Sequence, residues 1–177
     1  MYKNECICTL FSASQIEMRL EELAAEINND YMGKEILLVG TLKGAYIFMA
    51  DLSRKLTSLV EIDFMKASSY GDSTRPSELK IEKMLSIDPA GKHVLLVEDI
   101  VDTGRTLLGL RDTIIEQNAA SLRICTLLDK PSRREVELPA CEYVGFTIPD
   151  EFVVGYGLDY AQRYRCLPYI GILSFEN

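Results

Sequence analysis

The chain has 177 residues, 47% hydrophobic and 26% charged, which is typical of one globular domain with a sizeable core. Its net charge of −8 argues against nucleic acid or an anionic membrane as the main partner, because both would repel an acidic protein. No apolar run approaches the ~18 residues of a membrane span. The first five residues also lack the basic-then-apolar order of a signal peptide, so we expect a cytoplasmic protein.

The cysteines indicate neither a disulfide framework nor a zinc site. There are five, an odd number, and no Cys-x-x-Cys pair occurs among them. Cys6 and Cys8 lack a nearby second pair of ligands, which a zinc site would need. Reduced thiols in a reducing compartment are the simpler interpretation.

The N-terminal part predicts a short edge strand over residues 7–11 and then a helix. Ser12 and Gln15 have the spacing of a capping box. Apolar residues then recur at helical spacing from Ile16 to Ile27, and Gly33 can end the helix. We interpret this helix as a scaffold element.

Residues 35–40, Glu-Ile-Leu-Leu-Val-Gly, have the mainly apolar character of a short buried strand, and Thr41-Leu42-Lys43-Gly44 and a helical run over 45–56 follow. No Gly-Lys-Ser/Thr occurs in the chain, so a P-loop nucleotide-binding site is excluded. Taken alone, Leu-Lys-Gly is a weak signal, because a plain turn between a strand and a helix reads the same way.

The next segment predicts a strand and a long loop. Residues 60–65 alternate between apolar and polar, as in a strand with one buried face. The stretch from Lys66 to Lys80 is polar and rich in turn-forming residues, so it predicts an exposed mobile loop.

The most informative stretch begins with the apolar run 94–97 and continues with three acids, Glu98, Asp99 and Asp102. Acids at the end of a buried strand are costly unless they bind something. The following turn, residues 103–106, is Thr-Gly-Arg-Thr and opens a helical pattern, so its free N–H groups and hydroxyls form an anion cradle. Carboxylates for hydroxyls or a metal, followed by a phosphate pocket, fit a sugar phosphate.

His93, the one histidine, lies where this strand starts, whereas the acids lie where it ends. Ligands of parallel sheets collect at the carboxyl ends of the strands, so we expect His93 to be structural or solvated. Its isolation also excludes mechanisms that need a Ser-His-Asp or a Cys-His arrangement.

The remaining apolar runs, 122–128, 143–148 and 167–173, predict further strands. The first of these is followed by Lys130, which alone would read as a solvated side chain. Phe152 alone would read as a core aromatic. Because polar groups follow several buried strands, we predict an α/β parallel sheet with its site along one edge.

The segment Val-Glu-Asp-Ile-Val-Asp-Thr-Gly at residues 97–104 resembles the 5-phosphoribosyl 1-pyrophosphate (PRPP) motif of type I phosphoribosyltransferases, in particular their hypoxanthine-guanine branch. Leu42-Lys43-Gly44 and residues 150–160 match further motifs, and the resemblance runs from about Ile7 to Leu173. It implies a single domain over 1–177 with flanking helices. It also implies a flexible lid at about 67–80 and a small hood built from the N-terminal segment and residues of about 150–177.

The resemblance also implies roles for the ribose phosphate site. Asp102 would act as the general base that takes the proton from purine N7. Glu98 and Asp99 would hold the ribose hydroxyls, directly or through water bound to Mg²⁺. The 5-phosphate would be held by the loop residues Thr103, Gly104, Arg105 and Thr106.

On the pyrophosphate side, the resemblance implies a loop of Leu42, Lys43 and Gly44 with a cis Leu42–Lys43 peptide, assisted by Arg165. Mg²⁺ would be associated with Glu98, Asp99 and Asp159. On the purine side, it implies that the base is bound by Lys130 at its 6-oxo group, by stacking on Phe152, through the backbone of Val153, and near Asp159. Ser69 and Tyr70 match the lid.

The function implied is purine salvage, with PRPP and a 6-oxopurine (hypoxanthine and/or guanine) as substrates. A PRPP-sensing regulator of the same fold and a xanthine-preferring or pyrimidine enzyme stay open as alternatives. The presence of Asp102 and the acidic charge speak against a regulator that binds nucleic acid. Lys130 and Phe152 favour a 6-oxopurine over a pyrimidine or adenine. The family usually forms dimers or tetramers, so we expect a homodimer or homotetramer.

Overall fold

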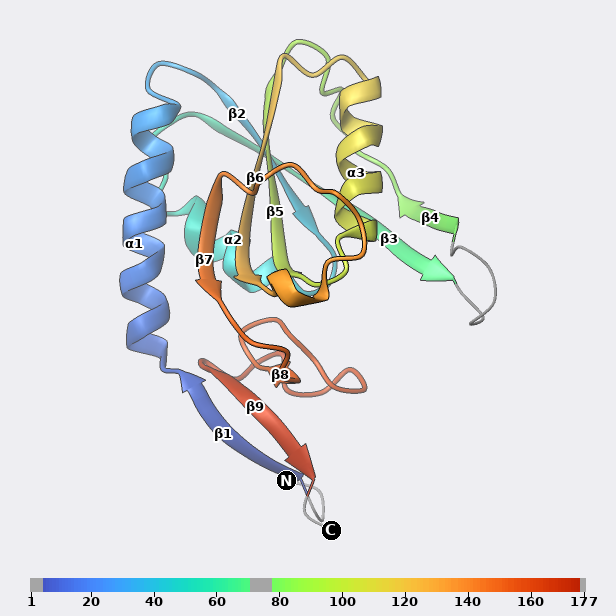
Figure 1. Ribbon diagram of the computed structural model, residues 1–177. Coiled ribbons are helices and arrows are strands. Elements are labelled where there is room, and N and C mark those ends of the chain that lie inside the picture. Colours follow the sequence, from blue (N-terminus) through green and yellow to red (C-terminus); the bar gives the residue numbers. More distant parts are fainter. Residues whose placement is uncertain (1–4, 71–77, 176–177) are drawn as a thin grey trace.

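The computed structural model describes residues 5–70 and 78–175, which form a six-stranded sheet, a three-stranded sheet and three α-helices (Figure 1). The elements of the larger sheet and its helices are α1 (Ala13–Asp30), β2 (Ile36–Thr41), α2 (Tyr46–Ser53), β3 (Val60–Tyr70), β4 (Glu78–Lys83), β5 (His93–Val101), α3 (Arg105–Glu116), β6 (Ser121–Asp129) and β7 (Tyr143–Thr147). The smaller sheet contains β1 (Glu5–Phe11), β8 (Val153–Val154) and β9 (Ile170–Phe175), and a 3₁₀ turn, η1 (Pro131–Arg133), follows β6.

The larger sheet has the strand order β4-β3-β2-β5-β6-β7, and only β4 is antiparallel to its neighbour. The chain moves outward from β2 to β3 on one side and from β5 through β6 to β7 on the other. The direction of winding therefore reverses between β2 and β5. In open α/β sheets, the crevice at the carboxyl ends of such a strand pair is where ligands bind.

The sheet is buried on both faces, which explains the uninterrupted apolar runs of its central strands. Leu38 and Leu95 pack with α1 and α2 on one face, whereas Val39 and Leu96 pack with α3 on the other. All four leucine and valine side chains are fully buried. Within the described ranges, α1, α2 and α3 each fall short of the length or the apolar character that a membrane-crossing helix needs.

The predicted capping box at the start of α1 is confirmed. The Oγ of Ser12 accepts a hydrogen bond from the backbone N–H of Gln15 at 3.3 Å, and Oε1 of Gln15 accepts one from the N–H of Ser12 at 2.9 Å. The helix ends at Asp30, and Tyr31 caps it. Gly33 lies beyond the cap, in the left-handed conformation that the following turn requires.

The two ends of the described chain meet in the three-stranded sheet, where β1 pairs with β9 and β9 with β8, both antiparallel. Figure 1 shows this sheet beyond the carboxyl ends of β6 and β7. The predicted strand over residues 7–11 is therefore an edge strand, as expected, although it belongs to this small sheet and not to the large one.

The loop predicted for residues 66–80 is wrong where the structure describes it. Strand β3 continues through Tyr70 and pairs with β4 in register, with Ala67 opposite Ile81 and Ser69 opposite Leu79. Residues 71–77, which complete the predicted lid, lie outside the described residues. Polar residues dominate here because the described part of the hairpin is only partly covered: Ala67 and Ile81 pack against the core, whereas Lys80 and Glu82 are exposed.

A buried carboxylate, Asp63, fixes the base of this hairpin. Its Oδ2 accepts the N–H of Ile87 at 2.8 Å, and its Oδ1 accepts the N–H of Phe64 at 2.7 Å and a bond from Nζ of Lys83 at 3.1 Å. Burial raises the pKa of Asp63, but these hydrogen bonds to the charged form outweigh it and hold the pKa below its usual range.

Candidate active site

The residues predicted for the site lie at the carboxyl ends of three neighbouring strands. Lys43 and Gly44 follow β2, Glu98 and Asp99 lie near the end of β5, and Lys130 follows β6. Strands β2 and β5 are the pair at which the winding reverses. The structure thus brings these side chains to the crevice that the fold reserves for ligands.

Glu98 is buried, with 8% of its surface exposed. Its Oε1 accepts a hydrogen bond from the hydroxyl of Thr41 at 2.6 Å and one from the N–H of Asp99 at 3.1 Å. Burial, and next the charge of Asp99, raise the pKa of Glu98 well above its usual range. Hydrogen bonds from hydroxyl groups, which a ribose offers, would stabilise the charged form of this carboxyl group.

The Asp99 carboxylate is packed against the backbone of Gly44. A Cβ at residue 44 would overlap the Asp99 carboxylate, and a Cβ at Gly157 would overlap the carbonyl oxygen of Gly44. Gly157 has a φ of 104°, which favours glycine. Three segments distant in the sequence are therefore in direct contact here, and the two glycines make that contact possible.

The loop between β5 and α3 has the form of an anion cradle. Gly104 is the N-cap of α3 and takes a left-handed φ of 86°. Among the described residues, no hydrogen-bond partner is found for the backbone N–H groups of Thr103, Gly104 and Thr106. They border a cavity of about 90 Å³, which is room for several water-sized groups. Free N–H groups at a helix N-terminus favour a phosphate.

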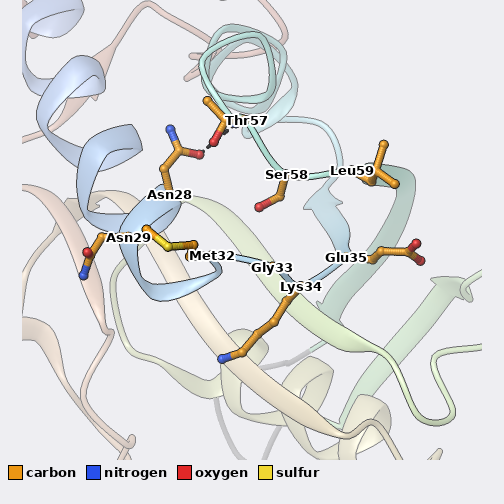
Figure 2. A pocket seen from close by; sticks show the side chains of 9 residues that line it. All are labelled: Asn28, Asn29, Met32, Gly33, Lys34, Glu35, Thr57, Ser58 and Leu59. Carbon is orange, nitrogen blue, oxygen red and sulfur yellow. Dashed lines mark hydrogen bonds between the residues drawn. The ribbon is translucent and has the colours of Figure 1, made fainter.

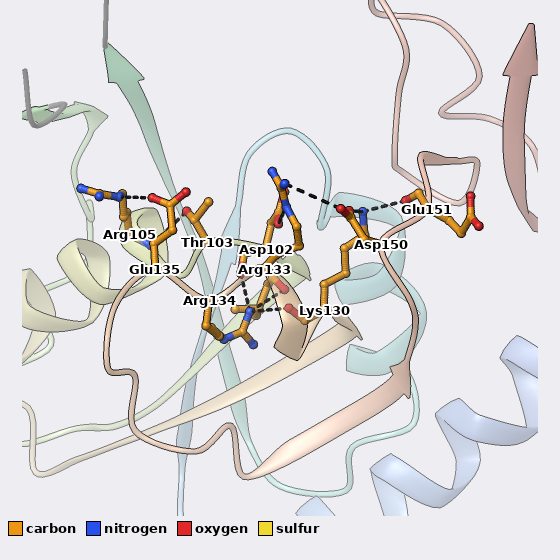
Figure 3. A network of polar contacts seen from close by, with 10 residues as sticks. Asp102, Thr103, Arg105, Lys130, Arg133, Arg134, Glu135, Asp150 and Glu151 are labelled. Atoms are coloured by element: carbon orange, nitrogen blue, oxygen red, sulfur yellow. Dashed lines mark hydrogen bonds and ion pairs between the residues drawn. The ribbon is translucent and has the colours of Figure 1, made fainter. Parts of the chain in front are cut away.

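Asp102 is half-exposed and forms an ion pair with Nε of Arg133 at 3.0 Å (Figure 3). Nη1 of Arg133 also lies 3.7 Å from Asp150. The predicted general base is therefore held by a cation in this structure, and a second carboxylate stands close to the same guanidinium.

Lys130 is buried, with 7% of its surface exposed, so it is not the solvated side chain that its residue type alone would suggest. Its Nζ donates to the carbonyl of Glu151 at 2.6 Å and lies 3.6 Å from Asp150. The ammonium is thus fixed between the end of β6 and the segment that leads to β8, with donor capacity left for a ligand.

In the loop predicted to bind pyrophosphate, the peptide between Leu42 and Lys43 is cis, as the resemblance implied. Nζ of Lys43 donates to Oε1 of Gln162 at 3.1 Å. Arg165 donates to the carbonyl of Gly157 at 2.7 Å and pairs with Asp159 at 2.6 Å. The loop over residues 157–165 therefore connects three residues predicted for the site, Lys43, Asp159 and Arg165.

Phe152 is 52% exposed, so it is not a core aromatic. Its ring meets that of Tyr160 edge-on at 5.8 Å, and Tyr160 meets Phe175 at 5.5 Å. The neighbouring Val153 is buried in β8, where its backbone pairs with β9. An exposed, supported aromatic face beside Lys130 is suited to stacking on a planar base.

The predicted magnesium ligands do not form a preformed cage. Within residues 5–70 and 78–175, no group of three or more His, Cys, Asp or Glu side chains is placed to hold a metal ion. Mg²⁺ usually keeps several waters and takes one or two carboxylates plus substrate phosphates, so Asp99 or Asp159 with a bound pyrophosphate would fit it. Glu98 is the least suited of the three, because it is buried, with 8% of its surface exposed, whereas Asp99 and Asp159 are partly exposed.

Two features lie away from this site. His93 is at the start of β5, where its Nδ1 is 2.8 Å from Oγ of Ser121, so it is structural, as expected. A cavity of about 660 Å³ lies at the amino ends of β2 and β3 (Figure 2). Its lining includes Met32, Lys34 and Leu59, and it sits at the opposite end of the sheet from Lys43. The candidate site is therefore the smaller cavity at the carboxyl ends of the strands, where sheets of this kind bind ligands, and not the larger cavity at their amino ends.

Sequence reasoning missed four polar residues that contact the predicted site: Arg133, Arg134, Asp150 and Gln162. Each acts through a partner far away in the sequence. The sequence carried two signals for them: a run of charge over residues 133–135, three positions after the predicted lysine, and the place of Asp150 at the start of the motif over residues 150–160.

Comparisons with known proteins agree with this geometry. The phosphoribosyl transferase domain model matches residues 9–161. A hypoxanthine phosphoribosyltransferase of Haemophilus influenzae is 52% identical, with 99% of each chain covered. One of Salmonella typhimurium is 54% identical over 89% of this chain and 90% of its own. A crystal structure of a hypoxanthine-guanine phosphoribosyltransferase from Bacillus anthracis matches with a TM-score of 0.90 at 45% identity, covering 97% of this chain and all of the other. The chain therefore belongs to the phosphoribosyltransferase family and has the α/β fold of its type I members.

Proposed function

We propose that this chain transfers the 5-phosphoribosyl group of PRPP to a 6-oxopurine, hypoxanthine and/or guanine, giving the nucleoside 5-monophosphate and pyrophosphate. The observation that carries the proposal is that three carboxylates and a cradle of N–H groups unpaired among the described residues lie together at the end of β5 and in the loop that follows it, with Lys130 after the neighbouring strand and Phe152 before β8. This arrangement offers separate contacts to hydroxyls, phosphate and a flat base. The relatives named above support the choice of base.

The loop from Thr103 to Thr106 would hold the 5-phosphate through its backbone N–H groups and hydroxyls. Glu98 and Asp99 would accept hydrogen bonds from the ribose hydroxyls. Their negative charge would also stabilise the positive charge that develops on the ribose as the bond from C1 to pyrophosphate breaks. Lys43 and Arg165 would hold the departing pyrophosphate.

The purine would lie on Phe152, with its 6-oxo group accepting from Lys130 and its edge read by the backbone of Val153. As purine N9 bonds to C1, Asp102 would accept the proton from N7, a contribution of typically ~10²–10⁴-fold for a general base. Binding must free Asp102 from Arg133, and Asp150 stands 3.7 Å from the same guanidinium to take it over.

Mg²⁺ would supply charge neutralisation for the pyrophosphate, bound through that group and by Asp99 or Asp159. The hairpin of β3 and β4, with Ser69 and Tyr70 near its end, would close over the site as a lid and exclude water. The protein would work in the cytoplasm as a homodimer or homotetramer, which light scattering of the purified chain would establish.

The direct test is incubation with PRPP, Mg²⁺ and hypoxanthine, guanine or xanthine in turn, with nucleotide formation followed by absorbance. Turnover of hypoxanthine or guanine supports the proposal. Exclusive turnover of xanthine would replace it with the xanthine-preferring alternative, and no turnover with any base would refute it. Asp102→Ala should lower turnover far more than PRPP affinity, and near-normal turnover would remove Asp102 from its role.

A second candidate, a PRPP-sensing regulator of the same fold, is less favoured. It would need a basic face for nucleic acid, whereas the chain carries a net charge of −8. A filter-binding assay with RNA and DNA at low salt, with and without PRPP, distinguishes it from the enzyme.

A further inference from the structure

Three consecutive residues, Arg133 to Glu135, lie along the loop that carries the proposed base and phosphate cradle (Figure 3). Arg133 pairs with the carboxylate of Asp102, Arg134 donates to backbone carbonyls of the loop, and the N–H of Glu135 donates to the carbonyl of Thr103 at 3.0 Å. Arg134 and Glu135 both bind carbonyl groups of this segment, and of the two only Arg134 does so through its side chain.

The guanidinium of Arg134 contacts carbonyl groups on both sides of the site. Its Nη1 donates to the carbonyl of Val101 at 2.8 Å and to that of Asp102, and it lies 3.4 Å from the carbonyl of Lys130. The loop of the proposed base and the loop of the purine-binding lysine are thus joined by one side chain. A planar, fixed array of donors is what such a junction needs.

Asp129 orients this guanidinium. Its carboxylate pairs with Nη2 of Arg134, and both side chains are largely buried, at 22% and 17% exposure. A partly buried, charge-assisted pair of this kind has a defined geometry, unlike an ion pair in open solvent. The direction in which Arg134 presents its donors is therefore set by the last residue of β6.

The direction of the carbonyls determines the direction of the N–H groups. The peptide unit is planar and trans, so its C=O and N–H point to opposite sides. When the carbonyls of Val101, Asp102 and Thr103 face the segment 133–135, the N–H groups of the same peptides face away from it. These N–H groups belong to Asp102, Thr103 and Gly104, and the last two are cradle groups that have no partner among the described residues.

We propose that Arg134, oriented by Asp129, is a positioning residue that turns the loop N–H groups toward the sugar phosphate and fixes the backbone of Asp102. The proposal rests on the proposed function for its kinetic consequence, but its effect on phosphate binding stands without it. It assigns to Arg134 no contact with the substrate.

The test compares Arg134→Ala with Arg123→Gln. Arg123 is also partly buried and also pairs with a carboxylate, Asp30, but it lies at the other end of β6. Three quantities are measured for each: the melting temperature, the affinity for ribose 5-phosphate by calorimetry, and kcat and KM for PRPP.

We expect both variants to melt at lower temperature. Only Arg134→Ala should weaken ribose 5-phosphate binding, by about 10-fold, and lower kcat by about 10²-fold, because a loop misplaced by ~1 Å has effects of this size. Arg134→Lys should recover only part of the loss, because one ammonium cannot hold several carbonyls in a fixed plane. Affinity and kcat of folded Arg134→Ala within about 2-fold of the unchanged protein would overturn the proposal.

If Arg134→Ala does not fold, Asp129→Asn decides, since it keeps the guanidinium and removes its charged partner. It should weaken ribose 5-phosphate binding in the same direction, and unchanged binding would overturn the proposal. Failure of the positioning role and failure of the proposed enzyme activity are distinguishable. A chain that binds ribose 5-phosphate through Arg134 but converts no purine refutes the enzyme and keeps the positioning role.

Discussion

Gly44→Ala tests whether the contact between Asp99 and the proposed pyrophosphate-binding loop, residues 42–44, matters for the proposed reaction. The added methyl group would overlap the Asp99 carboxylate, which would have to move by about 2 Å to restore a separation of ~3.4 Å. A shift of 1 Å in a catalytic group can cost ~10²-fold in rate. We therefore expect kcat/KM for PRPP to fall by at least about 10²-fold, or about 3 kcal/mol of transition-state stabilisation.

Steady-state kinetics with varied PRPP measure this loss, and two further variants interpret it. Gly33→Ala adds a methyl in open space at the opposite end of the sheet, where its left-handed φ should lower stability by about 1 kcal/mol without changing kinetics. If the loss acts through Asp99, the double variant Gly44→Ala/Asp99→Ala should be no worse than Asp99→Ala alone. A folded Gly44→Ala with kcat/KM within about 5-fold of the unchanged chain would refute the reasoning.

Three further predictions concern stability and the metal. Leu95→Ala should lower the free energy of unfolding by about 3 kcal/mol in urea titrations, because the side chain is fully buried beneath α1 and α2. The control Met32→Ala removes an exposed side chain and should change the free energy of unfolding by less than about 0.5 kcal/mol. A loss under about 1 kcal/mol at Leu95 would contradict the packing described. Asp63→Ala should cost about 3 kcal/mol at pH 7. Because the pKa of Asp63 is lowered in the folded chain, this contribution to stability is present above the unfolded pKa of ~3.9 and is lost as pH falls through the folded pKa. The free energies of unfolding of the two proteins should therefore converge in acid. A difference that stays constant with pH would contradict this role of Asp63. Chelation of divalent ions should abolish turnover and added Mg²⁺ should restore it, whereas full activity in excess chelator would exclude the metal.

Much of the fold can be predicted from short stretches of sequence, because contacts between residues close in the chain and the burial of single strands determine it. Ser12 and Gln15 cap α1 through contacts three residues apart. The strand over residues 94–97 is uniformly apolar because both of its faces are covered. The acids that follow are conspicuous because a buried strand end does not tolerate them without a partner.

What the sequence did not reveal depends on pairing over long distances. Arg134 meets the carbonyl of Val101, 33 positions earlier, and Gln162 meets Lys43, 119 positions earlier. No local pattern encodes which carbonyl an arginine side chain will reach. The hairpin of β3 and β4 was missed for a related reason, since the alternation in β4 contains two apolar residues, Leu79 and Ile81, and is too short to mark a half-buried strand without its partner strand.

The most direct test is a crystal structure of the chain with PRPP and Mg²⁺. The account predicts the 5-phosphate on the N–H groups of Thr103 to Thr106, the ribose hydroxyls on Glu98 and Asp99, and C1 facing the space between Asp102 and Phe152. PRPP bound elsewhere, for example in the larger cavity beside Met32, or a ribose out of reach of both carboxylates, would contradict it.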